Sequence, residues 1–157
     1  ARVILVAAEE AGCKLILPSD VVLATEFKPN PETRLTAVQN VGADEMILDC
    51  GPGTVVALNQ AIDTCKTLIW NGPLGAFETP PFDAATMAVA EHVARAVREQ
   101  GLVAVGGGGD TVAALNQAGV ADDFTFISTA GGAFLEWMEG KVLPGVDVLM
   151  QRDAVSA

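Results

Sequence analysis

Four consecutive glycines at residues 106–109 lie between a short apolar run and a helix-like segment. Each glycine increases the backbone entropy lost on folding and adds no side chain to a core, so packing does not explain the run. A glycine-rich turn at the start of a helix presents several amide hydrogens beside the positive end of the helix dipole, and together these bind anions, usually phosphate. The sequence therefore predicts a strand, a phosphate-binding turn and a helix here.

Short apolar runs alternate with helix-like segments along the rest of the chain, whose 157 residues amount to about one domain. Strands are expected at 14–17, 21–24, 46–48, 67–70, 102–105 and 124–127. Helices are expected at 2–12, 54–64, 82–100, 111–116 and 132–139, with a surface loop at 26–34. This alternation predicts an α/β fold, with a doubly wound, mainly parallel, Rossmann-like sheet covered by helices on both faces.

The charge balance limits the class of ligand. The formal net charge is -11 and only nine residues are Lys or Arg, which argues against nucleic acid or an anionic membrane as a partner. A bound phosphate must then be met mainly by backbone amides, helix N-termini or a metal ion. Cys13, Cys50 and Cys65 have no short metal-ligand spacing, and an odd number of cysteines fits a secreted disulfide framework poorly, so a cytoplasmic protein is expected.

In a doubly wound sheet, ligands bind where strands turn into helices, so these turns hold the candidate residues. Asp110 follows the glycine run directly, and a carboxylate beside a phosphate is favourable when Mg²⁺ lies between them; the alternative is that Asp110 only caps its helix. A second glycine turn, at residues 130–132, either holds another anionic group or simply lets helix and sheet pack closely.

A third turn, at residues 71–78, combines two glycines and a proline with an acidic residue. Glu78 either accepts hydrogen bonds from ribose hydroxyls or is a solvated loop carboxylate. Neither GxxxxGK[ST] nor GxGxxG occurs, which excludes two common nucleotide-binding schemes as written. The lone His92 lies among Ala and Val in a helix-like segment and is interpreted as structural or solvent-facing.

These turns carry a family resemblance when they are taken together in order. Residues 70–78 (WNGPLGAFE), 107–111 (GGGDT), 128–133 (STAGGA) and 139–146 (EGKVLPGV) are similar to motifs of the C-terminal domain of phosphoglycerate kinases. Residues 17–21 (LPSDV) and 48–52 (LDCGP) also resemble that family. Each motif is weak by itself, but their order and spacing are specific, and the resemblance covers nearly the whole chain.

The resemblance implies a function. It implies Mg²⁺-dependent, in-line phosphoryl transfer between 1,3-bisphosphoglycerate with ADP and 3-phosphoglycerate with ATP, in the cleft of a two-domain enzyme that acts as a monomer. The nucleotide would be bound through Glu78 at the ribose, through Leu48, Pro73 and Ala76 at the adenine, and through Asn71 at the phosphates. Asp110 would hold Mg²⁺, phosphate oxygens would lie against Gly107, Gly108, Gly109 and Thr111, and the transferred group would face Gly131 and Gly132.

Two departures from the family pattern qualify this interpretation. Ala130 stands where the family has a third glycine, so the loop must differ if that position needs a positive φ. The family's glycine- and lysine-containing first turn and its phosphoglycerate-binding arginines, which belong to an N-terminal domain, have no counterpart here. Together with the absence of an initiator Met, this predicts that residues 1–157 are a partial C-terminal nucleotide-binding domain, with negligible activity alone and an exposed sheet edge prone to self-association.

Two rival interpretations stay open from the sequence. One is a non-catalytic nucleotide-binding module, which would bind ATP without any dependence on a phosphoglycerate. The other is a different doubly wound enzyme, such as a reductase or synthetase, that uses the glycine turns for a dinucleotide. The missing GxGxxG argues against the second.

Overall fold

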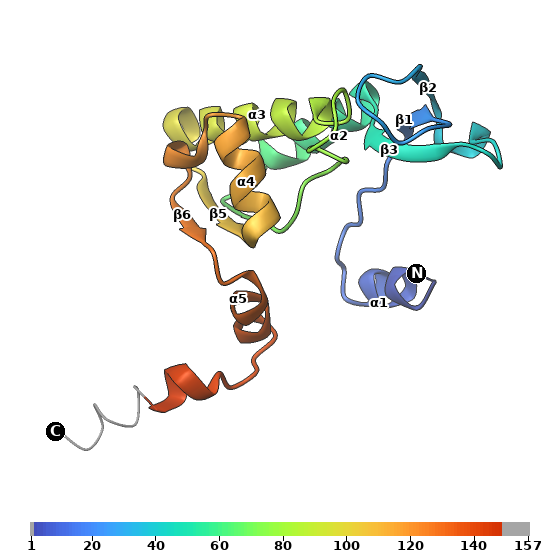
Figure 1. Ribbon diagram of the computed structural model, residues 1–157. Coiled ribbons are helices and arrows are strands. Elements are labelled where there is room, and N and C mark those ends of the chain that lie inside the picture. The colour runs from blue at the N-terminus through green and yellow to red at the C-terminus, as the bar shows by residue number, and fades with distance from the viewer. Residues whose placement is uncertain (1, 149–157) are drawn as a thin grey trace, which may run out of the picture. The chain divides into compact units, whose positions relative to one another are not determined.

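A computed structural model describes residues 2–148 of the chain (Figure 1). They form two compact units, which we describe separately: residues 2–65 with 74–92, and residues 66–73 with 93–148. Helix α3 (Ala84–Gln100) contributes its first part, up to His92, to the first unit and the remainder to the second. In the described part of the chain, no helix is both long and apolar enough to cross a membrane.

The first unit is built on a three-stranded sheet with the order β2-β1-β3. Its elements are α1 (Arg2–Glu10), β1 (Asp20–Ala24), β2 (Arg34–Ala37), the short 3-10 helix η1 (Val38–Asn40), β3 (Met46–Cys50) and α2 (Pro52–Ile62). Strand β1 pairs antiparallel with both neighbours, with Val22 opposite Leu35 on one side and Asp49 on the other.

The antiparallel pairing differs from the parallel arrangement expected for this part of the chain. Strands β1 and β2 are joined by a loop without a helix, and a loop of this kind returns the chain antiparallel, whereas a parallel pair needs a longer crossover. The strand expected at residues 14–17 is also wrong: these residues form no strand, while β2, which lies just beyond the expected surface loop, was not expected.

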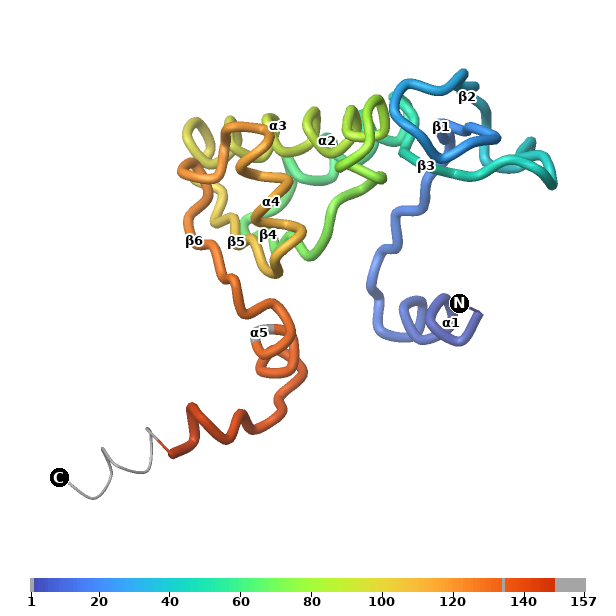
Figure 2. The backbone as a smooth tube through the Cα atoms, viewed as in Figure 1, coloured from blue at the N-terminus to red at the C-terminus, as the bar shows by residue number. Residues whose placement is uncertain are grey.

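The second unit contains the expected parallel sheet, with the order β4-β5-β6. Its elements are β4 (Thr67–Trp70), β5 (Val103–Gly107), α4 (Gly109–Gln117), the 3-10 helix η2 (Ala121–Asp123), β6 (Phe126–Ser128) and α5 (Gly131–Met138). Helix α4 packs on β5, and Figure 2 shows the chain passing from β6 into α5. The α/β fold class with a parallel sheet is confirmed.

Buried apolar side chains hold each unit together. In the first unit, Leu23 and Phe82 are fully buried, together with Val21, Phe77 and Val89. In the second unit, the buried side chains are Trp70, Val93, Ala104, Leu115 and Phe124. Burial of one large apolar side chain contributes about 1.5–3 kcal/mol, so these residues fix the strands whose ends carry the turns described next.

Candidate nucleotide-binding site

The strand register of the second unit brings three turns to one edge of its sheet. Trp70 at the end of β4 pairs with Gly106, and Gly107 at the end of β5 pairs with Ser128. All three strands run parallel, so the residues that follow them emerge at the same, carboxyl edge. The expected convergence of residues 71–73, 107–111 and 128–132 is therefore present within this unit.

The glycine run ends at the start of α4. Gly108 is the residue before the helix, with φ 97°, and its amide donates to the Ser128 carbonyl oxygen at 3.0 Å. Asp110 is the second residue of the helix, so the alternative that Asp110 is the helix cap is wrong. Within residues 2–148, no side chain accepts a hydrogen bond from the amides of Gly109, Asp110 or Thr111. These amides remain available to an anion.

The second glycine turn lies directly against the first. A Cβ atom added at Gly131 would lie 2.5 Å from the Gly108 Cα and 2.7 Å from the Gly108 nitrogen, so only glycine fits between the two backbones. Ala130 has φ -93°, so its side chain causes no backbone strain at the position where the resemblance leads one to expect glycine. Helix α5 begins at Gly131, close to the start of α4.

The turn after β4 is tied to α4 by a backbone-to-side-chain bond. The Gly72 amide donates to Thr111 Oγ1 at 2.7 Å, and the Trp70 indole nitrogen donates to the Gly72 carbonyl oxygen at 2.6 Å. Thr111 is almost fully buried, and Asn71, between the two bonded residues, is exposed. The turn that carries Asn71 is thus brought to Thr111, as expected. Thr111 Oγ1 already accepts a hydrogen bond from the Gly72 amide.

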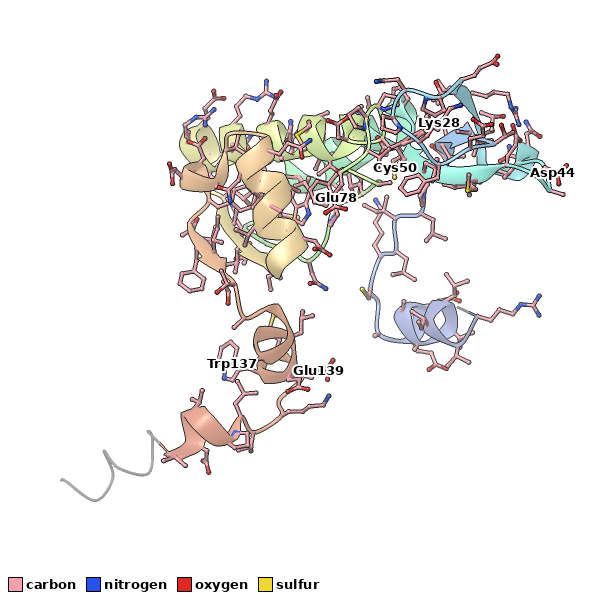
Figure 3. All side chains as sticks on the ribbon, viewed as in Figure 1. Lys28, Asp44, Cys50, Glu78, Trp137 and Glu139 are labelled. Atoms are coloured by element: carbon pink, nitrogen blue, oxygen red, sulfur yellow. The ribbon has the colours of Figure 1, made fainter. Side chains whose placement is uncertain are left out.

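The first unit carries the residues expected at the adenine and ribose. The Ala76 amide donates to the Leu48 carbonyl oxygen at 2.9 Å, which brings these two residues together as expected. Glu78, labelled in Figure 3, lies on the loop before α3 and is exposed, so its carboxylate is accessible. Pro73 belongs to the second unit, and its expected role beside Ala76 stays a prediction.

A buried carboxylate supports the loop that carries Ala76 and Glu78. Asp49 is 2% exposed; it accepts hydrogen bonds from the Ala85 amide at 3.0 Å and from the Cys50 amide at 2.8 Å. A Cβ atom at Gly75 would collide with the Asp49 carboxylate and with the Phe82 carbonyl oxygen. Asp49 therefore fixes both the start of α3 and the path of the loop.

Asp20, at the start of β1, closes the N-terminus of α2 from outside the helix. Its two carboxylate oxygens accept from the Gly53 amide at 2.8 Å and the Thr54 amide at 2.6 Å. The Thr54 hydroxyl also donates to this carboxylate at 2.6 Å. The N-cap residue itself, Gly51, has no side chain to do this, so a distant aspartate replaces it.

The two aspartates differ in the direction of their pKa shifts. For Asp49, burial raises the pKa, an effect only partly opposed by the amide hydrogen bonds from Ala85 and Cys50. For Asp20, burial also acts to raise the pKa, but the bonds from Thr54 and Gly53 outweigh it and the pKa is lowered. Burial likewise raises the pKa of the Cys50 thiol, with a contribution from Asp49, so this thiol is protonated and unreactive at neutral pH.

The candidate metal ligand Asp110 is solitary. Among the described residues, no three His, Cys, Asp or Glu side chains form a group that could hold a metal ion. A single exposed carboxylate does not make a protein cage for a cation. It does fit Mg²⁺, which is commonly held by one or two carboxylates together with substrate phosphates and water.

Three structurally important residues were not assigned roles from the sequence: Asp20, Asp49 and Trp70. The signal for the two aspartates was a carboxylate at or beside the end of an apolar run. For Asp20 there was a second signal, because the helix that it closes follows Gly51, which has no side chain of its own. Trp70 carried a weaker signal, an indole directly before an Asn-Gly-Pro turn. His92, interpreted as structural or solvent-facing, is partly exposed and pairs with Asp63 at 2.7 Å.

Comparison with known proteins agrees with this geometry. Residues 1–141 match the family model described as phosphoglycerate kinase. The chain is 75% identical over 150 residues to the phosphoglycerate kinase of Maricaulis maris and 65% identical over 149 residues to that of Sphingopyxis alaskensis. These alignments cover 96% and 95% of this chain but 37% of each relative, so the chain spans little more than a third of the proteins it matches.

Solved structures show the same relationship. A phosphoglycerate kinase from Coxiella burnetii is similar to 96% of the chain, with a TM-score of 0.87 and 36% identity, and the match covers 37% of that protein. One from Pyrococcus horikoshii is similar to 85% of the chain, with a TM-score of 0.70 and 26% identity. The fold, the ordered turns and these matches together show that the chain belongs to the phosphoglycerate kinase family.

Proposed function

We propose that this chain supplies the nucleotide site of a glycolytic phosphoglycerate kinase, as part of its C-terminal domain. The reaction is the reversible, Mg²⁺-dependent transfer of a phosphoryl group between 1,3-bisphosphoglycerate with ADP and 3-phosphoglycerate with ATP. The phosphoglycerate is bound, on this proposal, by parts of the longer protein outside these 157 residues. We propose that the whole enzyme is a cytoplasmic monomer.

The observation that carries the proposal is the pair of uncapped helix starts in the second unit. Helices α4 and α5 begin at Gly109 and Gly131, with the two glycine turns in backbone contact at Gly108 and Gly131. Two adjoining helix N-termini present amide hydrogens and two positive dipole ends to one ligand. A polyphosphate can bind to both helix N-termini at once, which suits a chain that has few cationic side chains to bind phosphate.

The proposed roles follow from where each residue lies. The amides of Gly109 and Thr111 bind the nucleotide phosphates, and Gly107 and Gly108 let the phosphates approach the backbone, since the Gly108 amide is already bonded to Ser128. Asn71 reaches the phosphates from the neighbouring turn, and Gly131 and Gly132 face the transferred group. In the first unit, Leu48 and Ala76 contact the adenine and Glu78 accepts from the ribose, with Pro73 completing the adenine contacts. For such a reaction the protein contributes mainly positioning and charge neutralisation.

Asp110 is the proposed Mg²⁺ ligand. Mg²⁺ held there would neutralise charge on the nucleotide phosphates. The chain's own contribution is one carboxylate held in the first turn of α4, beside amides that bind phosphate oxygens. This placement explains why an acidic residue is tolerated at an anion site, because a cation between them reverses the repulsion.

A hybrid enzyme tests the proposal. In this hybrid, the chain replaces the 150 matched residues of the Maricaulis maris relative, so that the remaining two thirds come from a protein that is already complete. We expect the hybrid to phosphorylate 3-phosphoglycerate with ATP in a coupled assay, only when Mg²⁺ is present, and the isolated 157-residue chain to show negligible turnover. A folded hybrid without turnover, or a fully active isolated chain, would contradict the proposal.

Ligand titrations separate the rival functions. Calorimetry of the hybrid with MgADP, with NAD and with MgADP plus 3-phosphoglycerate compares the three interpretations directly. The proposal expects MgADP to bind and NAD not to bind. A hybrid that binds MgADP but never transfers phosphate would favour the non-catalytic module, and tighter binding of NAD would favour a dinucleotide enzyme.

A further inference from the structure

The turn that follows β4 is held by hydrogen bonds to side chains. The ladder between β4 and β5 ends at the pair Trp70 and Gly106, so Asn71 and Gly72 lie beyond the last sheet pairing. Gly72 has φ 101°, a conformation that glycine reaches easily but leaves as easily. Sterics therefore do not lock this turn.

Two side chains form hydrogen bonds with the backbone C=O and N–H groups of Gly72. The Trp70 indole nitrogen donates to the Gly72 carbonyl oxygen at 2.6 Å, and the Gly72 amide donates to Thr111 Oγ1 at 2.7 Å. Trp70 is 7% exposed and Thr111 is 1% exposed, so neither side chain can swing out to another partner without leaving the core. We call these three residues the Gly72 clamp.

Each anchor of the clamp is itself fixed by packing. The Trp70 ring packs against Phe124 with the ring centroids 6.3 Å apart, and a methyl group of Thr111 lies beside Gly106. Thr111 also belongs to the first turn of α4, directly after Asp110. The clamp thus links the end of β4 to the start of the helix that carries the proposed phosphate amides.

We propose that Trp70 is a positioning residue for nucleotide binding, acting through the Gly72 clamp. The indole N–H holds the Gly72–Pro73 peptide and Thr111 holds the Asn71–Gly72 peptide, so Gly72 is fixed on both sides and Asn71 is thereby presented at the start of α4. This inference rests on the proposed function, because Asn71 is useful there only if a nucleotide phosphate binds. Trp70 touches no ligand in this role.

The variant Trp70→Phe in the hybrid enzyme tests the clamp, since phenylalanine keeps an aromatic ring but removes the N–H. Loss of one hydrogen bond that orders a binding group should raise KM for MgATP by about five- to tenfold. KM for 3-phosphoglycerate should stay unchanged, because that ligand is bound elsewhere on the proposed function. A purely structural Trp70 would lower the melting temperature and leave both KM values as they were.

Phe124→Leu is the matched control. It removes the ring that packs on Trp70 but leaves the indole N–H, so we expect a lower melting temperature with KM for MgATP within twofold of the parent. Thr111→Val should raise KM for MgATP, and Thr111→Ser, which keeps the acceptor oxygen, should restore it. Because Trp70 and Thr111 hold the two peptide groups on either side of the Gly72 Cα, they act on the same residue. The double variant Trp70→Phe with Thr111→Val should therefore bind MgATP no more weakly than the weaker-binding of the two single variants.

The outcomes are distinct. If Trp70→Phe leaves KM for MgATP within twofold, if Phe124→Leu raises it equally, or if the two substitutions at the clamp multiply independently, the clamp is overturned while the proposed function stands. If the unsubstituted hybrid neither binds nor turns over MgATP, both proposals fall together.

Discussion

Helices α2 and α3 start at carboxylates supplied by the antiparallel sheet, whereas α4 and α5 start at glycine turns that no side chain in the described residues closes. Asp20 reaches the first turn of α2 from β1, and Asp49 reaches the first turn of α3 from β3. All four helices have N-terminal amides that need an acceptor from outside the helix, because the first four N–H groups of any α-helix lack intrahelical partners.

The difference shows which helix starts can bind a ligand. At α2 and α3, a protein carboxylate occupies the place of an anion, so the positive end of the dipole serves stability. At α4 and α5, no side chain among the described residues caps the helix, and Gly131 leaves no room for a side chain beside Gly108. The first unit thus uses helix N-termini to hold its own loops, and the second leaves them without a side-chain cap, as the proposed phosphate site requires.

The largest expected effect comes from Gly131→Ala, which forces the two open helix starts apart. Its Cβ would lie 2.5 Å from the Gly108 Cα, and backbone atoms have no rotamer with which to yield. We expect a loss of about 1–3 kcal/mol in the free energy of unfolding, as for other overpacked sites. The clash also displaces the amides of both helix starts, so the affinity of the hybrid for MgADP should fall, by about tenfold for each 1.4 kcal/mol of binding free energy lost.

Gly132→Ala is the control for this clash. The next residue has open space around its Cβ position, so the substitution should leave the free energy of unfolding of the hybrid within about 0.5 kcal/mol of the parent. Urea denaturation of both variants measures the contrast. Equal stability of the two alanine variants would show that the glycine turns are not in contact.

A second, smaller contrast compares two aspartates at helix starts, Asp20→Ala and Asp110→Ala. Removing the Asp20 carboxylate leaves the Gly53 and Thr54 amides without their acceptor and should lower the free energy of unfolding by about 1–2 kcal/mol, the upper range for a lost cap. Asp110 is exposed and bonds to no helix amide, so its removal should leave stability nearly unchanged and abolish most Mg²⁺-dependent turnover of the hybrid.

The opposite pattern would show that helix starts with and without a side-chain cap do not differ in the way described. If Asp20→Ala reduced turnover at unchanged stability, α2 would be a ligand site. If Asp110→Ala destabilised the fold as much as Asp20→Ala, α4 would be capped like α2. Thermal unfolding and coupled-assay rates on the same two preparations distinguish these cases.

The parallel sheet and its turns could be read from the sequence because their signals are local. Continuous apolar runs such as residues 67–70 end at glycine turns, and both the strand type and the turn chemistry follow from neighbouring residues. Strand β6 was placed only approximately, at 124–127 and not Phe126–Ser128, since an apolar run does not mark where pairing begins.

The first unit was less predictable because its organisation depends on contacts between distant residues. The antiparallel pairing of β1 with β3 joins residues 21 and 50, and the Asp20 cap joins residues 20 and 54. A short apolar run carries no information on the direction of its partner strand. The role of Trp70 was missed for a related reason: which backbone group a side chain bonds is decided by the turn conformation.

The pH dependence of stability should separate the two closing carboxylates, with a smaller effect than removal of the cap. The pKa of Asp20 is lowered in the fold, so its contribution is complete above the unfolded pKa, near 4, and is lost as the pH falls through the folded pKa. The pKa of Asp49 is raised by burial, so the folded chain holds the proton longer and ionisation of Asp49 lowers stability as the pH rises above about 4.

Asn variants expose these opposite slopes. Relative to the parent, Asp20→Asn should be most destabilised at pH 7 and approach parental stability near pH 3. Asp49→Asn loses one of two amide acceptors at every pH, but its stability relative to the parent should increase as the pH rises. Urea midpoints measured between pH 3 and 7 give both curves. Parallel curves for the two variants would mean that burial does not dominate at Asp49.

The smallest expected effect is at Glu78, which lies outside both kinds of helix start. Its carboxylate is exposed and supports no described part of the fold, so Glu78→Gln should leave the melting temperature unchanged. A hydrogen bond to an ionised acceptor is stronger than one to a neutral amide, so the loss of charge should raise KM for MgATP by about threefold while kcat changes little.

The matched substitution Glu45→Gln removes a carboxylate that is paired with Arg34. It should reverse the pattern, with a lower melting temperature and an unchanged KM. A nucleotide KM that responds to Glu45→Gln but not to Glu78→Gln would remove the ribose role and leave binding to the glycine turns alone.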